Sequence, residues 1–347
     1  MRVFLTGGTG FIGQPLTQAL LARGWSVAAL VRKPEAPQAR ALSKMGAQCV
    51  VGDVTDPAPM RAGMSGADIV IHNAGQYEFG VNADGKRRMH AINVTGTENV
   101  LSLAMELGVP RSVYVSTVWA VGDTGQQMRD ETFERQTPCR TWYEKTKTEA
   151  HAIARQYQQR GLPLVIACPN GVIGANDHSV WGYYLRLYLH RLMPPFGWSP
   201  GCMFSLVEVN DLAQGIALAA EKGRMGETYI FAGEPKSTRE HLAFWAMEPG
   251  AFKVLVWLPA GLIAASFLLL EPLQRMAGLP AFMSRETVRA SSTNLYYSSE
   301  KAQSEIGWTH RFAHEMWFNT IEGELELMSK RKKRDLVSLL KPVELEG

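Results

Sequence analysis

Short apolar runs alternate with longer stretches of helical periodicity through the first half of the chain. The runs are bounded by glycine, proline or polar residues, which predicts strands at 3–6, 26–31, 48–51, 69–72, 112–116 and 164–167. Between them apolar residues recur at helical spacing, as at Ile12, Leu16, Ala19 and Leu20, and predict helices at 10–23, 91–107 and 142–159. Strands separated by helices pair in parallel. Right-handed crossovers then give a doubly wound α/β sheet of the Rossmann type, with helices on both faces.

This alternation stops after Pro169. Helices are predicted at 180–192 and 313–328, and 234–309 is mostly helical and apolar, while a helix at 209–220 and a strand at 229–231 return to the main sheet. We therefore expect a nucleotide-binding domain at 1–170, with 205–232 returning to it, and an interwoven substrate-binding lobe formed by 171–204 and 233–330. A basic and apolar tail follows at 331–347. The lobe would cover the carboxyl edge of the sheet, where open α/β folds bind ligands.

Composition places the chain among ordinary globular enzymes. Of its 347 residues, 46% are hydrophobic and 20% charged, and the net charge of +3 is too small to indicate a nucleic-acid partner. Cys49, Cys139, Cys168 and Cys202 are scattered, which fits a reducing, cytoplasmic location and neither a disulfide framework nor a metal site. The sequence leaves open whether the chain forms a homodimer.

The stretch 254–270 has no charged residue, and the tail carries the basic run 330–334. Seventeen residues reach only the lower edge of the roughly 17–25 needed to span a bilayer, and Pro259 and Gly261 interrupt them. We expect a helix starting near Pro259 that lines or caps the substrate cavity. Attachment to a membrane surface through this stretch or the tail is the alternative, which we do not favour because terminal charge runs are usually solvated.

A glycine-rich turn follows the first strand. Gly7, Gly10 and Gly13 are spaced G-x-x-G-x-x-G between a predicted strand and a predicted helix. The first glycine permits a tight turn, the second lets backbone amides approach a pyrophosphate, and the third lets the helix pack close to the strand. The helix amino end adds a positive pole. We therefore predict a dinucleotide site that also includes Thr9, Phe11 and Ile12.

The end of the second strand indicates which dinucleotide binds. NAD enzymes commonly place an acid there for the ribose hydroxyls, whereas NADP enzymes place a cation for the 2′-phosphate. Here the strand runs into Arg32 and Lys33, and the first acid is Glu35. Because a guanidinium offers a planar fork to a phosphate, NADP is favoured over NAD.

Further cofactor contacts are expected where the third and fourth strands end. Asp53, followed by Val54, can accept a hydrogen bond from the adenine amino group. Asp56 has the plainer role of a helix N-cap. The segment His72, Asn73, Ala74 and Gly75 would line the pyrophosphate and the nicotinamide ribose.

Tyr143 and Lys147 lie four residues apart in a predicted helix, so their side chains share one face. An ammonium beside a phenol lowers its pKa from about 10, which makes Tyr143 a usable general acid or base. Lys147 can also hold the ribose. Thr117, at the end of the fifth strand, would orient the substrate oxygen. Ser116 is the alternative, and strand alternation points the two side chains in different directions.

These motifs together resemble the extended short-chain dehydrogenase/reductase superfamily over nearly the whole chain. The segment TGGTGFIG at 6–13 matches its cofactor signature, and Asp53, the stretch from Asn93 to Thr97, and the Tyr143/Lys147 pair match as well. The stretch 115–122 looks like the strand that carries the catalytic hydroxyl, at Thr117. The stretch 168–174 is similar to a segment that usually begins Arg-Pro, although Cys168 replaces the arginine. The cofactor-contact residues predicted in these segments are Asn93, Ser116, Pro169 and Val172.

Within that superfamily the chain looks most like the dihydroflavonol-4-reductase-like branch, which neighbours 3β-hydroxysteroid dehydrogenases. The supporting stretches are 174–179 and 296–302, while 72–75 departs from the branch's usual His-x-Ala-Ala. The resemblance implies an NADP(H)-dependent oxidoreductase that reduces a ketone or aldehyde, or oxidises the alcohol, of a fairly apolar small molecule.

Two other functions stay open on the same fold. A nucleotide-sugar epimerase with tightly bound NAD is the second reading, although the lobe offers few cations for a diphosphate. Dehydratases of the superfamily place an Asp-Glu pair after the catalytic threonine, where this chain has Val118 and Trp119. A non-catalytic NADP-binding sensor is the third reading, since fold alone does not settle activity.

Overall fold

A computed structural model describes residues 1–248, 253–276 and 284–330. A parallel sheet of seven strands in the order β11-β6-β5-β4-β1-β2-β3 forms its centre. The order reverses at β1 (Arg2–Thr6), which pairs with β2 (Ser26–Val31) on one side and β4 (Ile69–His72) on the other. A switch point of this kind opens a crevice at the carboxyl ends of the strands. The other strands of this sheet are β3 (Gln48–Val51), β5 (Arg111–Val115), β6 (Leu164–Pro169) and β11 (Thr228–Phe231).

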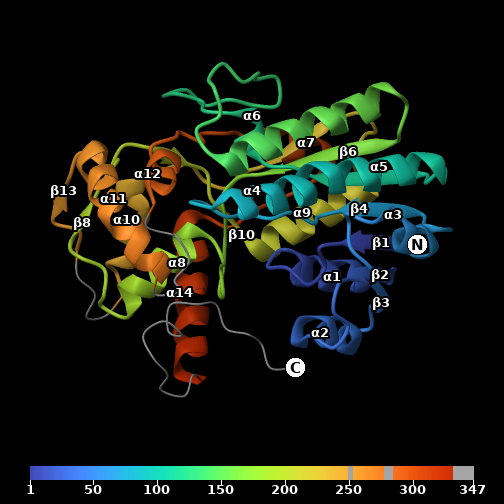
Figure 1. The fold of residues 1–347 in the computed structure, drawn as a ribbon, viewed down its shortest axis with the longest axis horizontal. Coiled ribbons are helices and arrows are strands. Elements are labelled where there is room, and N and C mark those ends of the chain that lie inside the picture. Colours follow the sequence, from blue (N-terminus) through green and yellow to red (C-terminus); the bar gives the residue numbers. More distant parts are fainter. Residues whose placement is uncertain (249–252, 277–283, 331–347) are drawn as a thin grey trace.

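Two helical layers cover the sheet (Figure 1). One face packs on a core shared with α1, α2, α9 and α13, and the other on a core shared with α3, α5 and α7. Strand residues are buried on both faces, which explains their continuous apolar runs. The bounds are α1 (Gly13–Leu21), α2 (Pro37–Met45), α3 (Pro57–Met64), α5 (Gly96–Glu106), α7 (Trp142–Gln159), α9 (Val209–Lys222) and α13 (Glu300–Ile306).

The helix expected at 91–107 differs from the observed one. It starts earlier, as α4 (Ala83–His90), because the side chain of Asn82 accepts a hydrogen bond from the Gly85 amide and caps it. A π-helical turn at Ala91–Thr95 then joins α4 to α5. The longer helix carries Asn93 toward α7.

A second, mostly helical region lies beside the carboxyl edge of the sheet (Figure 1). Aromatic side chains of α8, α10 and α14 pack together there, with Trp245 and Trp317 fully buried. In contrast, α13 packs on α9 and β11, although its residues fall in the range that we assigned to the lobe. The remaining elements are α6 (Val118–Val121), α8 (Val180–Leu189), α10 (Thr238–Trp245), α11 (Ala260–Met276), α12 (Arg285–Ser291), α14 (Ala313–Lys330), β7 (Val172–Ile173), β8 (Phe196–Gly197), β9 (Met203–Phe204), β10 (Val207–Glu208), β12 (Lys236–Ser237) and β13 (Val256–Trp257).

Candidate active site

The glycine-rich turn between β1 and α1 depends on glycine at two close approaches. Gly7 has φ +72°, and a Cβ there would lie 2.7 Å from the backbone nitrogen of Ala74. A Cβ on Gly13 would lie 2.0 Å from the carbonyl oxygen of Gly7. By contrast, a Cβ on Gly10 would approach only that same carbonyl, at 3.3 Å, and Gly10 is exposed. The conformation of the turn therefore requires glycine at positions 7 and 13, whereas Gly10 lies on the solvent-exposed side of the turn.

The amino end of α1 has the features of a phosphate site. Its N-cap, Ile12, makes no side-chain capping bond, and its first turn has no acid. Thr9, Phe11 and Ile12 are half-buried around it. Uncapped amides with the positive end of a helix dipole favour an anion, so the turn fits the pyrophosphate of a dinucleotide.

The end of β4 meets the glycine-rich turn, as expected. Asn73 donates from Nδ2 to the carbonyl of Gly7 at 3.3 Å, and the Ala74 amide donates to Thr6 Oγ1 at 3.1 Å. Gly75 follows directly. Residues 73–75 and the turn therefore form one continuous edge.

The residues predicted to hold the adenosine end lie after β2 and β3. Arg32 and Lys33 are exposed, and neither makes an ion pair with the described part of the chain. Asp53 accepts hydrogen bonds from the amide and hydroxyl of Thr55 through Oδ1, at 2.9 and 2.8 Å. Val54 is buried beside Gly96. Asp56 caps α3 by accepting from the Ala58 amide, the plainer role that we expected.

The two candidate hydroxyls lie just after β5, which ends at Val115, and their side chains have different partners. Thr117 is buried at the N-cap of α6, where its side chain accepts from the Trp119 amide at 3.3 Å, and it lies near enough to Tyr143 to act on the pKa of that phenol. Ser116 instead lies 2.8 Å from Nδ1 of His151. The geometry thus puts Thr117, rather than Ser116, beside Tyr143.

Lys147 lies under Tyr143, on the same face of α7. It is buried, and its Nζ donates to the hydroxyl of Tyr114 and the carbonyl of Val115, each at 3.1 Å. The expected lowering of the Tyr143 pKa is wrong for this arrangement. Burial raises that pKa above its usual value, although the charge of Lys147 and the side chain of Thr117 both act to lower it.

Other predicted contact residues have neighbours that the sequence did not reveal. Asn93 is buried, accepts from the Gln76 amide at 2.7 Å through Oδ1, and donates from Nδ2 to Thr146 Oγ1 at 3.0 Å. It therefore fastens the loop after β4 to α7. Pro169 ends β6, and Val172 begins β7. Contact of Asn93, Pro169 and Val172 with the cofactor stays a prediction.

His72, which we expected to line the cofactor together with residues 73–75, is fully buried in the structure. Its Nδ1 lies 2.8 Å from Thr6 Oγ1 and its Nε2 lies 3.0 Å from Thr97 Oγ1. Burial, assisted by the charge of Lys147, lowers the His72 pKa to about 3, so the ring is neutral. The sequence did carry a signal for this arrangement. A histidine ends an apolar strand, and the helix predicted nearby contains threonines that could bond to it.

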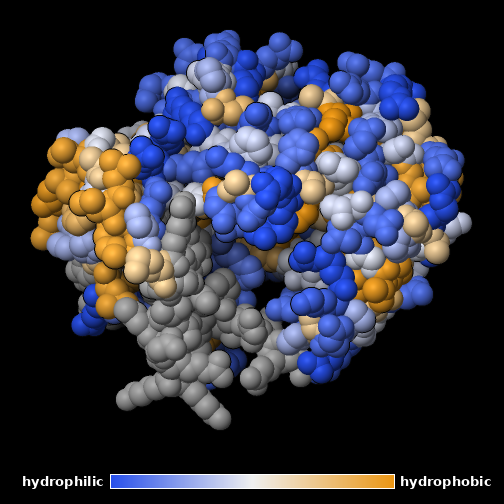
Figure 2. All heavy atoms as spheres, in the orientation of Figure 1, coloured by the Kyte–Doolittle hydropathy of each residue, from blue (hydrophilic) through white to orange (hydrophobic). Residues whose placement is uncertain are grey.

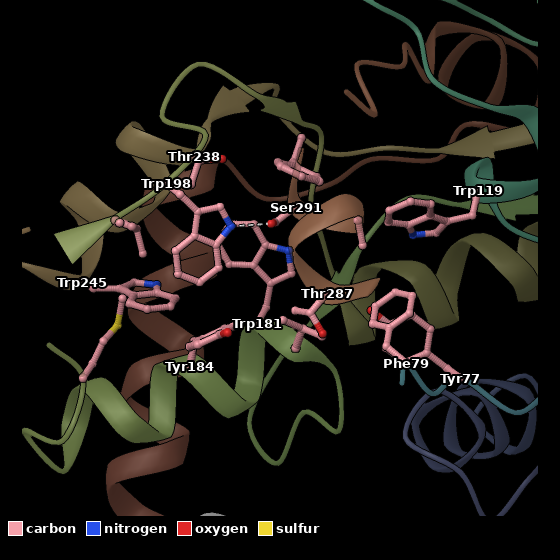
Figure 3. A pocket seen from close by; sticks show the side chains of 16 residues that line it. Tyr77, Phe79, Trp119, Trp181, Tyr184, Trp198, Thr238, Trp245, Thr287 and Ser291 are labelled. Atoms are coloured by element: carbon pink, nitrogen blue, oxygen red, sulfur yellow. Dashed lines mark hydrogen bonds between the residues drawn. The ribbon is translucent and has the colours of Figure 1, made fainter. Parts of the chain in front are cut away.

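An aromatic pocket is lined by residues of α8, α10 and α12, among others (Figure 3). It encloses about 690 Å³, its open mouth included, and none of the described residues that line it is charged. Figure 3 shows indole and phenyl rings on several of its sides, with Trp198 Nε1 donating to Ser291 Oγ at 2.6 Å. The lining residues are Tyr77, Phe79, Trp119, Val180, Trp181, Tyr184, Met193, Gly197, Trp198, Phe204, Thr238, Leu242, Trp245, Thr287, Ala290 and Ser291.

Ring contacts join this pocket to Tyr143. The ring of Tyr77 meets that of Tyr143 edge-on, with centroids 4.7 Å apart, and Phe79 does so at 6.3 Å. Both Tyr77 and Phe79 line the pocket. Tyr77 and Phe79 therefore connect the lining of the pocket to the ring of Tyr143.

The apolar stretch 254–270 forms β13 and most of α11, so the expected helix is present and starts at Ala260. The expectation that it lines the cavity is wrong, because no residue of α11 is among the lining residues. It supports the wall from behind, with Phe267 packed edge-on against Trp198 at 6.3 Å between ring centroids. Among the described residues, no helix combines the length and apolar character needed to cross a membrane.

Comparison with known proteins assigns the chain to a family. The model of the NAD dependent epimerase/dehydratase family matches residues 3–232. The chain belongs to this family. The match spans β1 to the residue after β11, and therefore contains the glycine-rich turn, the Tyr143/Lys147 pair and every other predicted site residue.

Similar proteins place this epimerase/dehydratase family member near reductases. It is 31% identical to a putative dihydroflavonol 4-reductase of Synechocystis, over 88% of this chain and 89% of that protein. It is 30% identical to a 4-hydroxy-2-methyl-3-oxo-4-farnesyl-3,4-dihydroquinoline-1-oxide ketoreductase of Stigmatella aurantiaca, over 92% and 96%. The crystal structure of gox2253 superposes with a TM-score of 0.79 at 28% identity, over 95% and 99%. The protein is thus an enzyme of the extended short-chain dehydrogenase/reductase type, as the resemblance implied.

Proposed function

We propose that this enzyme is an NADP(H)-dependent oxidoreductase that reduces the carbonyl of an apolar small molecule. The observation that carries the proposal is the uncharged aromatic pocket that meets Tyr143 through Tyr77 and Phe79. Such a pocket favours an apolar ligand and offers a few hydroxyl and indole groups to orient it. The ketoreductase of Stigmatella, whose name describes a farnesylated substrate, supports the same class.

The residues around Tyr143 supply the acid–base half of the reaction. Bound NADPH supplies the hydride to the carbonyl carbon. Tyr143 gives its hydroxyl proton to the carbonyl oxygen, which yields the alcohol, and the phenolate then takes a proton from solvent. Thr117 positions the oxygen beside Tyr143, and the nearby charge of Lys147 favours the phenolate.

NADP is the proposed cofactor because of the cations that follow β2. Arg32 is exposed, with no ion-pair partner in the described residues, so its guanidinium is available to a 2′-phosphate. The uncapped amino end of α1 and the exposed Gly10 support a pyrophosphate nearby.

A nucleotide-sugar epimerase is disfavoured by the same pocket. A sugar nucleotide carries a diphosphate, and such groups are usually bound by arginine, lysine or helix amino ends. In the part of the chain that the structure describes, no cation lines the pocket. A diphosphate there would lose its hydration without gaining a counter-charge.

The proposal is tested by following NADPH oxidation with a panel of ketones. The panel holds a steroid ketone, a long-chain 3-oxo acid, a prenylated aromatic ketone and acetone, with UDP-glucose epimerisation measured in parallel. We expect turnover with one or more of the apolar ketones and a much higher KM for acetone. Epimerisation without any ketone reduction would contradict the proposal, as would tight NADPH binding with no turnover across the panel.

A further inference from the structure

An apolar surface covers the outer side of α11 and the adjoining β13. Its side chains are largely exposed: 83% for Met276, 77% for Leu269, 75% for Leu255 and 64% for Leu262. Figure 2 shows hydrophobic residues gathered at this end of the molecule, over α11 in the orientation of Figure 1. We call this surface the leucine face, and it consists of Leu255, Val256, Leu262, Leu268, Leu269, Leu270, Leu273 and Met276.

The opposite side of α11 is packed, so the leucine face is not simply an undocked helix. Ile263 and Phe267 are buried and form a small core with Val288 of α12. The carboxylate of Glu271 accepts from the Arg285 amide at 2.8 Å and ties α11 to α12 again. Because the inner side of α11 packs against α12, the leucines on its other side point outward. Single exposed leucines are common, but a contiguous group of this kind marks an interaction surface.

The rim of the leucine face is basic. Lys253 precedes β13, and Arg285 and Arg289 lie on α12, all three exposed. Two acids of the same region are turned toward backbone amides: Glu271 toward Arg285, and Glu286 toward the amides of Gly80 and Trp142, each at 2.6 Å. Exposed cations therefore lie on α12, which packs against α11, and just before β13. Cations next to an apolar face are the pattern of a surface that meets anionic lipid headgroups.

An aromatic residue lies between the apolar and basic parts. The indole of Trp257 on β13 lies under the guanidinium of Arg239, 5.3 Å from the ring centroid. Tryptophan and arginine both favour the boundary between water and hydrocarbon.

The dimensions of α11 exclude a spanning orientation. It has 17 residues, of which Pro272 is one. Its inner side is bound to the lobe, so the helix cannot leave the protein to enter a bilayer. A shallow position parallel to the surface, with the leucines among the upper acyl chains, satisfies both facts.

The leucine face adjoins the substrate pocket. Phe267 of α11 packs on Trp198, which lines the pocket, and α12 contributes Thr287, Ala290 and Ser291 to the same lining. If the leucine face contacts lipid, only α11 therefore separates the lipid from the wall of this pocket.

We infer that the leucine face docks the protein on the surface of a bilayer that contains anionic lipid. A second copy of the chain is a poorer occupant, because a symmetric contact through the leucine face would bring the two basic rims together. The inference concerns a surface and does not depend on the proposed reaction.

The test is co-sedimentation of the full chain with vesicles, without substrate or cofactor. One set of vesicles is phosphatidylcholine alone, and the other contains about one third phosphatidylglycerol. We expect binding to the anionic vesicles, weaker binding to the neutral ones, and release by salt. The variant L262S/L269S/L273S should bind at least about tenfold more weakly, since each exposed leucine would otherwise enter the acyl region.

The matched control removes exposed apolar side chains elsewhere, in V51S/M128S, and should bind like the unmodified chain. Thermal melting checks folding, and neither variant should melt earlier because the replaced side chains are exposed. Absence of vesicle binding by the unmodified chain would overturn the inference. So would equal binding by the leucine variant, which would assign the attachment to the basic tail. The unmodified chain could instead form a dimer and not bind vesicles. If the leucine variant were then monomeric, the leucine face would be assigned to contact with a second copy.

Discussion

The ammonium of Lys147 donates to the hydroxyl of Tyr114 at 3.1 Å, across the interface between α7 and β5. Tyr114 is fully buried, and its ring also stacks on that of His72, with centroids 5.6 Å apart. A charge buried at this depth requires partners, and Tyr114 and the carbonyl of Val115 supply two. These two hydrogen bonds therefore fix the position of Lys147. Its charge lies close enough to favour the phenolate of Tyr143.

Lys147→Ala should weaken cofactor binding and slow turnover together. The substitution removes the charge that favours the Tyr143 phenolate and the group that we expect at the ribose. Isothermal titration with NADPH and steady-state kinetics measure the two effects. Lys145→Ala is the matched control, because Lys145 lies on the exposed side of the same helix. Loss of rate with unchanged NADPH affinity would remove the ribose role.

Alanine at two glycines of the turn should have different consequences. Gly13→Ala places a Cβ 2.0 Å from the Gly7 carbonyl, a backbone atom that cannot move aside, so we expect a lower melting temperature and no cofactor binding. Gly10→Ala meets only a 3.3 Å contact and should melt nearly as the unmodified protein does, yet bind NADPH more weakly. Comparing melting curves with titrations separates the two. Full NADPH affinity in Gly10→Ala would move the pyrophosphate away from this turn.

Arg32→Ala should remove most of the preference for NADP over NAD. Loss of a charge-assisted phosphate contact costs about 1.5–3 kcal/mol, or roughly ten- to a hundredfold in Kd for NADP, and should leave NAD binding almost unchanged. Titration of both cofactors measures the change, with the exposed Lys44→Ala as the control. Equal affinity of the unmodified enzyme for the two cofactors would refute the assignment.

Acid should destabilise the aromatic part of the lobe through His241. Its Nδ1 accepts from Trp317 Nε1 at 3.0 Å and its Nε2 lies 3.2 Å from the Phe204 carbonyl, so the buried ring has no site for a second proton. Burial lowers its pKa to about 4, against about 6.5 in the unfolded chain. The unfolded state therefore binds more protons in this window, and stability present above pH 6.5 is lost as the pH falls toward 4.

Urea unfolding between pH 7 and 4 measures this effect, which is on the order of 3 kcal/mol for His241. His241→Gln retains a donor and an acceptor but does not titrate, so its stability should fall less steeply with acid. His72 and His151, whose pKa values burial lowers to about 3 and 4, act in the same direction in both proteins. Asp177, whose pKa burial raises to about 6, acts in the opposite direction in both. Parallel pH curves for variant and parent would show that His241 does not contribute.

Local patterns were enough to predict the sheet and to bring the glycine-rich turn and the Tyr143/Lys147 pair into view as candidates. The strands predicted at 26–31, 48–51 and 69–72 have those bounds, because buried parallel strands are written as continuous apolar runs. Ser116 and Thr117 have different partners, as expected, although both lie after the end of β5. The fixed offset of four residues put Tyr143 and Lys147 on one face of α7.

What could not be predicted depends on contacts distant in sequence. The net direction of the Tyr143 pKa follows from burial by Tyr77 and Phe79, which come from another loop. Glu286 bonds the amides of Gly80 and Trp142, an arrangement that no local pattern reveals. The position of α11 behind the pocket wall depends on Phe267 meeting Trp198, 69 residues earlier in the chain.

The rate of hydride transfer by Tyr143→Phe, measured in a single turnover with NADPH and a reducible apolar ketone, tests the central claim most directly. The substitution removes only the phenol hydroxyl and leaves the ring that packs against Tyr77. General acids contribute about 10²–10⁴-fold, so we expect a loss of that size with NADPH affinity nearly unchanged. A near-normal rate would show that another group protonates the substrate, and would contradict the account.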